Sequence, residues 1–363
     1  MSAKVTMQDI ADALGFSRNT VSKAINNTGV IAENTKELIL KKAAEMGYRN
    51  PSGQEGEVSG ITPQKPAADL ASPGCNKIAM FTSSMPGGSH FAVTTLDRMQ
   101  QIFSAYGFDL SFFRTTPKEL ENLCLPGSLH PEETAGIFCM EMFHHEYCRM
   151  LAELGKPLLL IDGPVHSGSD PLPVDMLLME NHAGIFSFVR QISEKGKKSV
   201  GFVGNMQHCR SFFERGSACI TAAAVNGLLP AEQYSILSFP PGSNITNSAA
   251  YADYTNDLYE MLQKLPALPD AFICANDFIA INLISSLRRI NIRCPEDILV
   301  MGFDDSPESR FHSPSLTTVH IHTQTMGKLA AELLLSRIAD PDRAPRTTYS
   351  LTDLILRESS RLE

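Results

Sequence analysis

A short segment near the start of the chain carries side chains that suit contacts with nucleic-acid bases. Four polar residues share one face of this segment, 18–25, and they are Arg18, Asn19, Ser22 and Lys23. Arginine and lysine match the acceptors on guanine edges, asparagine matches adenine, and hydroxyl groups match phosphates. An ordinary helical hairpin would explain the apolar residues of the segment but not this shared polar face. The pattern therefore predicts a helix that reads DNA from its exposed side.

The neighbouring residues predict the elements that hold this segment in place. Thr6 is a suitable N-cap for a helix over 7–14, and Gly15 permits the left-handed turn that ends it. Ser17 then caps the second helix, and 34–46 has the apolar spacing of a third. Two helices joined by a short turn form the motif that places one helix in a major groove. The start of the chain is therefore predicted to be an all-α helix-turn-helix head.

The charge of the chain is unevenly distributed. Residues 1–50 hold seven Lys and Arg and five Asp and Glu, a net +2, whereas the rest holds 24 and 35, a net −11, and together they make the −9 of the whole. A small basic head on an acidic body fits a protein that touches DNA at one end. No stretch has the apolar length of a membrane span, and the first ten residues lack the apolar run of a signal peptide. We therefore expect a cytoplasmic protein that contacts no membrane.

Composition divides the remainder of the chain into a linker and a body. Residues 51–76 are rich in Pro, Gly and Ser and nearly free of large apolar side chains, which is typical of a linker. From Lys77 onward, short apolar runs alternate with amphipathic stretches of helical period. This alternation predicts parallel sheets covered by helices on both faces. About ten strands are many for a single sheet, so we expect two α/β lobes.

The motifs of the common enzyme classes are absent from the sequence. It contains no GxGxxG after the first apolar run, no GxxxxGK[ST] phosphate loop, no GxSxG elbow and no HExxH zinc helix. The eight cysteines include no CxxC pair, and the adjacent His144 and His145 would point about 100° apart on a helix. We therefore expect no catalytic residue, no cofactor and no metal site, and we do not expect an enzyme.

Three runs of the head resemble the LacI family of bacterial transcription regulators. They are Val5-Thr6-Met7-Gln8-Asp9-Ile10-Ala11, Thr20-Val21-Ser22-Lys23-Ala24-Ile25-Asn26 and Ala44-Glu45-Met46-Gly47-Tyr48. The resemblance implies base-reading positions at Arg18, Asn19 and Lys23, with mainly structural or phosphate-facing roles for Thr20 and Ser22. The candidate DNA-binding set of the head is therefore Thr6, Ser17, Arg18, Asn19, Thr20, Ser22 and Lys23. The resemblance also implies a repressor that binds a pseudo-palindromic double-stranded operator as a homodimer. No heptad helix follows Arg357-Glu358-Ser359, so we expect a dimer rather than a tetramer.

The segment after the head departs from the family pattern. The family follows Tyr-x-Pro-Asn with a hinge helix containing Ala-Arg-x-Leu, whose leucine enters the minor groove. This chain has Tyr48-Arg49-Asn50-Pro51 and then a polar stretch. Leu70, in Ala67-Ala68-Asp69-Leu70, is a candidate for a displaced hinge leucine and completes the DNA-binding candidates. Asp69 stands where a cation would help at DNA, and Leu70 lies 22 positions after Tyr48, so we favour a flexible tether without a minor-groove contact.

Further family landmarks lie in the body, so that the resemblance covers nearly the whole chain. They are Ala275-Asn276-Asp277, Pro295-Glu296-Asp297-Ile298, Met301-Gly302-Phe303-Asp304-Asp305 and Pro314-Ser315-Leu316-Thr317-Thr318-Val319. They imply an α/β domain like the periplasmic binding proteins, with two Rossmann-like lobes and a ligand between them, beyond the carboxyl ends of the strands. The expected bounds are 1–50 for the head, 51–76 for the linker and 77–363 for the effector-binding and dimerisation domain, with lobe 1 at about 77–162 and 295–322 and lobe 2 at about 163–294 and 323–363.

Four residues are candidates for contact with a small polar effector, for which a carbohydrate is the first choice. They are His90, Phe91, Arg215 and Asp277. The resemblance places Arg215 at the family's effector-contacting arginine and Phe91 at an apolar wall, and the Asp277 carboxylate can accept hydroxyl hydrogens. Each of these three has a structural alternative: a surface arginine, a core phenylalanine and a helix cap. The chain has no Trp, so a sugar would stack on Phe or Tyr, and a nucleobase or another polar effector stays open.

Two other functions stay open at this point. A solute-binding protein would need a secretion signal and no DNA-binding head, and the sequence favours neither. A regulator whose cleft binds no ligand would share every motif described above. A ligand screen by thermal shift separates this last possibility from an effector-controlled regulator, because a ligand that binds the native state raises the melting temperature.

Overall fold

The computed structural model describes residues 6–25, 35, 38, 39, 42, 43, 46, 70, 74–83, 90–165, 171–239 and 251–361. The chain divides into two units, Met1–Thr62 and Pro63–Glu363, which are described separately. The expected boundaries at residues 50 and 76 stay predictions. No helix among the described residues is long and apolar enough to cross a membrane.

The first unit contains the two predicted helices of the head. Helix α1 spans Met7–Leu14, and Gly15 ends it at a φ of 72°. The Thr6 hydroxyl accepts a hydrogen bond from the Asp9 backbone N–H (3.3 Å), and the Asp9 carboxylate accepts one from the Thr6 N–H (2.7 Å), which forms a capping box. Helix α2 spans Arg18–Ile25. The structure therefore confirms the predicted helix, turn and helix.

The apolar sides of α1 and α2 share one small core. It consists of Ile10, Ala11, Val21, Ala24, Ile39 and Ala43, all of which are buried. Ile39 and Ala43 belong to the predicted third helix, 34–46, most of which lies outside the described residues. Burial of these side chains holds α2 by its apolar side and leaves its polar side to solvent.

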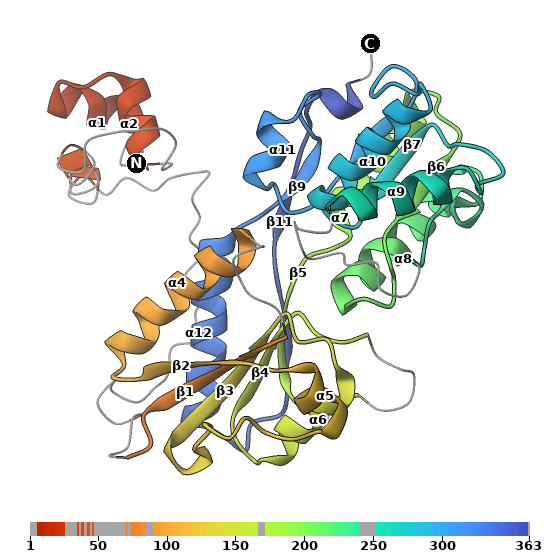
Figure 1. Cartoon of the computed structure of the whole chain (residues 1–363). Helices are drawn as coiled ribbons and strands as arrows, with labels where there is room; N and C mark the ends of the chain where they lie inside the picture. Colours follow the sequence, from red (N-terminus) through yellow and green to blue (C-terminus); the bar gives the residue numbers. More distant parts are fainter. Residues whose placement is uncertain are drawn as a thin grey trace. The chain divides into compact units, whose positions relative to one another are not determined.

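The second unit begins with a six-stranded parallel sheet. Its strands, in spatial order, are β10 (Thr347–Ser350), β5 (Asp175–Met179), β4 (Leu158–Ile161), β3 (Thr134–Met140), β1 (Lys77–Thr82) and β2 (Asp109–Arg114). Helices α4 (His90–Ala105) and α12 (Thr323–Ala339) pack together on one face, and α5 (Pro117–Asn122) and α6 (His145–Glu153) lie on the other (Figure 1). The central strands are therefore buried on both faces, as parallel strands usually are.

A second parallel sheet is shorter and also has flanking helices. Its strands, in spatial order, are β6 (Val200–Val203), β7 (Ala271–Cys274) and β8 (Leu299–Met301). The helices of this lobe are α7 (Ala183–Glu194), α8 (Arg210–Val225), α9 (Tyr251–Leu262), α10 (Asp277–Arg289) and α11 (Pro307–Phe311), with α7 packing on α8 and α9 on α10. The short 3-10 helices are η3 (Pro131–Glu133), η4 (Ala231–Tyr234) and η6 (Glu358–Ser360). Two α/β lobes are thus present, which confirms the predicted fold class.

An antiparallel pair of strands lies where the chain passes between the lobes. Strand β9 (Thr318–Ile321) leads into α12, strand β11 (Thr352–Ile355) follows β10, and the two strands pair with each other. Figure 1 shows them between the two sheets. The chain therefore changes lobe after β5, after β9 and after β10.

The assignment of segments to lobes differs from the expected one and is corrected here. Residues 295–322 belong to the second lobe, because β8 pairs with β7. Residues 323–350 and strand β5 belong to the first lobe, because β10 pairs with β5 and β5 with β4. A buried ion pair fixes this arrangement: the Arg337 guanidinium of α12 contacts the Asp175 carboxylate of β5 at 2.9 Å. Pairing between strands that are far apart in sequence decides which lobe a segment joins, and local composition does not predict such pairing.

Candidate DNA-reading helix and effector site

Helix α2 presents its predicted base-reading side chains to solvent. Arg18, Asn19 and Lys23 are exposed, whereas Val21 on the opposite side is fully buried. Because α1 holds the apolar side of this helix, its polar side is available to enter a groove. The structure thus brings the three predicted base-reading residues together on one accessible surface.

Thr6, Ser17 and Thr20 take part in the capping of the two helices. The Ser17 hydroxyl accepts a hydrogen bond from the Thr20 backbone N–H (3.0 Å) and lies 2.8 Å from the Thr20 hydroxyl. Thr20 and Ser22 are half-buried, and Thr6 caps α1. The Ser17 and Thr20 hydroxyl groups stabilise the start of α2, which agrees with the structural role expected for Thr20. Their contacts with DNA stay predictions.

Leu70 belongs to the second unit of the chain. Its side chain is 8% exposed and packs in the main hydrophobic core of that unit. A leucine that enters a minor groove would have to leave this core. The burial of Leu70 therefore favours the tether over the displaced hinge.

Arg215 is the central charged group of the second unit. It lies on α8, its side chain is 3% exposed, and its guanidinium is 3.5 Å from the ring centre of Phe303. Its Nε donates to the Asn181 side-chain oxygen (2.9 Å), and one Nη donates to the Ala275 carbonyl (2.6 Å). The same Nη lies 3.7 Å from the Asp304 carboxylate. The surface-residue alternative for Arg215 is therefore wrong.

Asp277 is buried, and both of its carboxylate oxygens already accept hydrogen bonds. The Thr318 hydroxyl donates to one oxygen (2.5 Å), and the Ser306 backbone N–H donates to the other (2.7 Å). Burial, followed by the negative charge of Asp304, raises the pKa of Asp277 to about 8. The cap of α10 is Asn276, whose side chain accepts from the Ile279 N–H (2.9 Å). Asp277 therefore ties α10 to the segment after β8 and to the start of β9, rather than capping its helix.

The close packing around Asp277 also explains a neighbouring glycine. A Cβ atom at Gly302 would lie 2.3 Å from an Asp277 carboxylate oxygen and 2.9 Å from the Leu316 side chain. Any larger residue at 302 would displace the carboxylate from Thr318 and Ser306. The Gly302-Phe303-Asp304 turn is therefore built around the buried Asp277.

Three carboxylates outside the predicted set of site residues follow the carboxyl ends of strands and interact electrostatically with one another around Asp304. Glu141 follows β3, Asp162 follows β4, and Asp304 follows β8, and all three have positive φ angles (53°, 54° and 112°). The pKa of Asp304 is raised to about 6, mainly by burial. The positive charge of Arg215 lowers this pKa, and the negative charges of Glu141 and Asp162 raise it. Asp304 is 33% exposed, unlike Asp277. A carboxylate directly after an apolar run was the signal in the sequence.

Contacts between the two lobes surround Arg215. The Asp162 carboxylate accepts from the Ser211 N–H at the start of α8 (3.2 Å), and the Tyr349 hydroxyl of β10 donates to Glu214 (3.0 Å). The His208 ring lies 5.0 Å from the rings of both Phe143 and Phe212, and burial lowers its pKa to about 4. Because first-lobe and second-lobe groups meet here, a change in lobe spacing would alter the surroundings of Arg215.

The structure does not join the remaining candidates to this group. Phe91, on the first turn of α4, is half-buried and packs against the main core, as its structural alternative holds. Of His90 only the backbone is described. No contact between Phe91 and Arg215 or Asp277 is present among the described residues. The roles of His90 and Phe91 in effector binding stay predictions.

Comparison with known proteins identifies both units. The family described as bacterial regulatory proteins, lacI family, matches residues 6–51, and the periplasmic binding protein-like domain matches 189–360. The probable HTH-type transcriptional repressor ExuR of Bacillus subtilis is 25% identical over 359 residues, covering 98% of each chain. The repressor PurR of Mannheimia succiniciproducens is 26% identical over 364 residues, again with 98% of each chain covered.

The chain belongs to the LacI family.

Solved structures agree with this assignment at the level of the fold. The regulator CelR in complex with cellobiose matches with a TM-score of 0.66 and 22% identity, covering 98% of this chain and 100% of CelR. The lac repressor dimer bound to operator and the anti-inducer ONPF matches with a TM-score of 0.61 and 18% identity, with 99% of each chain covered. As a LacI-family member the chain is a DNA-binding transcription regulator, and its relatives are regulators rather than enzymes.

Two cavities of this LacI-family chain lie away from Arg215. One, of about 680 Å³, lies beside α7, and a smaller one, of about 200 Å³, is lined by residues that include Asp175 and Arg337. Neither is lined by Arg215, Asp277 or Phe91. No group of His, Cys, Asp and Glu suited to a metal ion is present in the described part of the chain.

Proposed function

We propose that this chain is a homodimeric transcriptional repressor whose paired α2 helices read a pseudo-palindromic operator and whose body binds a small polar effector. The exposed row of Arg18, Asn19 and Lys23 is the observation that carries the DNA-binding part. A dimer presents two such helices, so two half-sites follow from the symmetry. A repressor of chromosomal genes acts in the cytoplasm. The proposed bounds remain 1–50 for the head, 51–76 for a tether and 77–363 for the body.

The effector site that we propose is centred on Arg215 and Asp304. Arg215 uses Nε and one Nη within the protein, and its other Nη has no hydrogen-bond partner among the described residues. Asp304 is the partly exposed carboxylate beside it. A donor and an acceptor side by side suit the hydroxyl groups of a sugar. We assign the acceptor role to Asp304 rather than to Asp277, because both oxygens of Asp277 are already engaged.

The relatives support a carbohydrate as the effector. CelR is described in complex with cellobiose, and the lac repressor with ONPF. The lobes meet at Asp162 and Ser211 beside Arg215, so a ligand bound here would be sensed by both lobes. Effector binding would then shift the balance between two arrangements of the lobes in each subunit of the dimer.

Selection of DNA from a random pool by the full chain tests the first part of the proposal. We expect a recovered sequence with two half-sites related by a two-fold axis, bound by a dimer in analytical ultracentrifugation. Recovery of no preferred sequence, or of a single half-site bound by a monomer, would contradict the proposed function. Calorimetry of the same protein with a panel of mono- and disaccharides tests the second part.

A further inference from the structure

The cavity beside α7 has the size and composition of a small-molecule site. Its volume is about 680 Å³, within the usual range for ligand pockets. One wall is α7, and the other is the chain that follows β11, including η6. It shares no residue with the group around Arg215 and Asp304, so it is separate from the proposed effector site.

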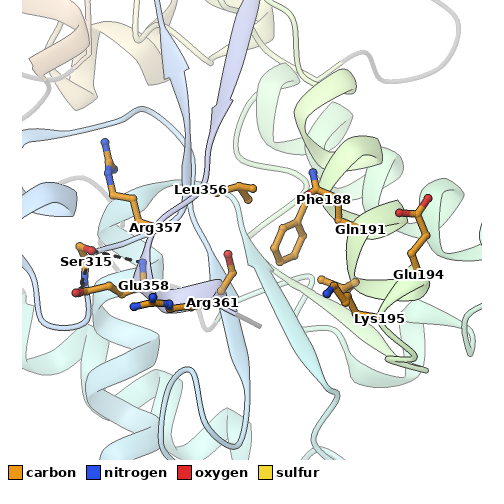
Figure 2. Close-up of a pocket in the computed structure, with 11 residues that line it drawn as sticks. Phe188, Gln191, Glu194, Lys195, Ser315, Leu356, Arg357, Glu358 and Arg361 are labelled. Atoms are coloured by element: carbon orange, nitrogen blue, oxygen red, sulfur yellow. Dashed lines mark hydrogen bonds between the residues drawn. The ribbon is translucent and has the colours of Figure 1, made fainter. Parts of the chain in front are cut away.

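The floor of the cavity is apolar. Phe188 and Ile192 lie four residues apart on α7 and are both about 1% exposed. Leu356 lies opposite Phe188 in the cavity and is 54% exposed (Figure 2). The exposed Leu356 side chain therefore offers apolar surface for a ligand to cover, next to the two packed side chains of α7.

Two cations lie above this floor on opposite walls. Lys195 is one helical turn from Ile192, and Arg361 follows η6, as Figure 2 shows. Both are exposed, and neither forms an ion pair within 4.0 Å among the described residues. Both side chains line the same cavity, so a ligand that fills it has a cation on each wall.

The other charged residues of the cavity have partners within the protein. Glu194 pairs with Arg190 at 4.0 Å. Glu358 accepts hydrogen bonds from the Ser315 N–H (2.8 Å) and hydroxyl (3.0 Å), which lower its pKa, and Arg361 lowers it further at longer range. Arg357 forms an ion pair with Asp305, outside the cavity. Among the described residues, Lys195 and Arg361 are therefore the cations of this cavity that form no ion pair within 4.0 Å.

We infer that this cavity binds an amphipathic organic anion, with the apolar part of the ligand over Phe188, Ile192 and Leu356 and its carboxylate or phosphate between Lys195 and Arg361. A second ligand site of this kind would let the regulator respond to an organic acid as well as to its effector. The inference does not rest on the proposed function, because the cavity and its charges are independent of the Arg215 group.

Calorimetry of the full chain with three probes of one shape tests the inference. The probes are 4-phenylbutyrate, 4-phenylbutan-1-ol and 4-phenylbutylamine, which share their apolar part and differ in head-group charge. We expect the anion to bind at least about tenfold more tightly than the alcohol or the amine, as charge-assisted hydrogen bonds would give. The double variant Lys195→Gln with Arg361→Gln should remove this preference for the anion. The single variant Leu356→Ser should lower the affinity for 4-phenylbutyrate, because it removes apolar contact. Both changes fall on exposed residues, so folding is expected to persist.

The control Lys118→Gln with Lys264→Gln removes the same charge from exposed residues outside the cavity and should leave binding unchanged. Equal affinity for all three probes, or no heat with the anion, would overturn the inference. Anion binding that survives the Lys195 and Arg361 changes but is lost on Arg215→Gln would also overturn it, because the probe would then occupy the effector site.

Discussion

The guanidinium of Arg215 lies 3.5 Å from the ring centre of Phe303, one residue before Asp304, with which it forms an ion pair. Phe303 is almost fully buried, and its ring packs against the guanidinium, whose N–H groups contact Asn181, the Ala275 carbonyl and Asp304. The geometry depends on a flat cation with several donors. A lysine at this position would keep the charge but lose the stacking and the fork of N–H groups.

The variant Arg215→Lys is therefore expected to lose effector binding while the chain still folds. Loss of charge-assisted hydrogen bonds costs about 1.5–3 kcal/mol, so effector affinity should fall by roughly tenfold to a hundredfold. Calorimetry with the cognate effector measures this, and operator binding in the absence of effector should stay within twofold of the parent. An Arg215→Lys protein that binds effector as the parent does would remove Arg215 from the site.

The raised pKa of Asp277 predicts a pH dependence of stability. The folded chain retains the Asp277 proton up to about pH 8, whereas the unfolded chain loses it near the ordinary value of 3.8. The folded state thus binds more protons, and the free energy of unfolding falls as the pH rises through this window, by at most about 1.4 kcal/mol per pH unit. Asp304, whose pKa is about 6, adds a similar fall at lower pH.

The variant Asp277→Asn should flatten this dependence between pH 6 and 8. Asparagine can accept from the Ser306 N–H and donate to the Thr318 hydroxyl without a charge. Urea unfolding at pH 6 and at pH 8 gives the free energy of unfolding of the parent and of the variant. Both proteins contain Asp304, so its contribution is common to the two. Equal declines in the parent and the variant would show that Asp277 is already ionised at pH 6.

The exposed residues of α2 are expected to set operator preference. Arg18→Ala or Lys23→Ala should cost about 1–3 kcal/mol of specific binding and relax the preference at the base that each side chain reads. Gel shifts on the selected operator and on single-base variants measure both effects. Lys118→Ala, a surface lysine of the body, is the charge-matched control. If Arg18→Ala and Lys23→Ala weakened all sequences equally, these residues would contact only phosphates.

A substitution at the buried Leu70 distinguishes a flexible tether at 51–76 from a hinge that contacts the minor groove. Leu70→Ala should lower the free energy of unfolding of the body by about 2 kcal/mol or more, because it leaves a cavity in a packed core. Operator affinity should hardly change if residues 51–76 are a tether. A large loss of operator affinity with unchanged stability would show instead that Leu70 enters the minor groove.

The sequence was informative where local patterns decide the structure. The capping box at Thr6, the left-handed Gly15 and the apolar positions of α1 and α2 are local features, and the head follows from them. The alternation of strands and helices likewise predicted two α/β lobes. The division of segments between the lobes depends instead on the pairing of β10 with β5 and on the Arg337–Asp175 contact, which join residues far apart in sequence.

Contacts between residues far apart in sequence also decide the roles of single residues in the candidate effector site, and the sequence did not predict them. Arg215 was predicted from the resemblance, but its burial against Phe303 depends on the packing of helix α8 against the segment that follows β8. Asp277 and Asp304 both follow a strand closely in the sequence, and only the structure distinguishes them. Asp277 accepts hydrogen bonds from Thr318 and Ser306, which lie far from it in the sequence. Asp304 is partly exposed beside Arg215.

Fluorescence anisotropy of the full chain on its selected operator, titrated with a panel of mono- and disaccharides, tests the central claim most directly. We predict that at least one sugar changes the operator affinity of the parent by about tenfold or more, within the usual range of allosteric coupling. The Asp304→Asn variant should bind the operator as the parent does and fail to respond to that sugar. A response of equal size in the variant, or no response of the parent to any polar ligand, would contradict the account.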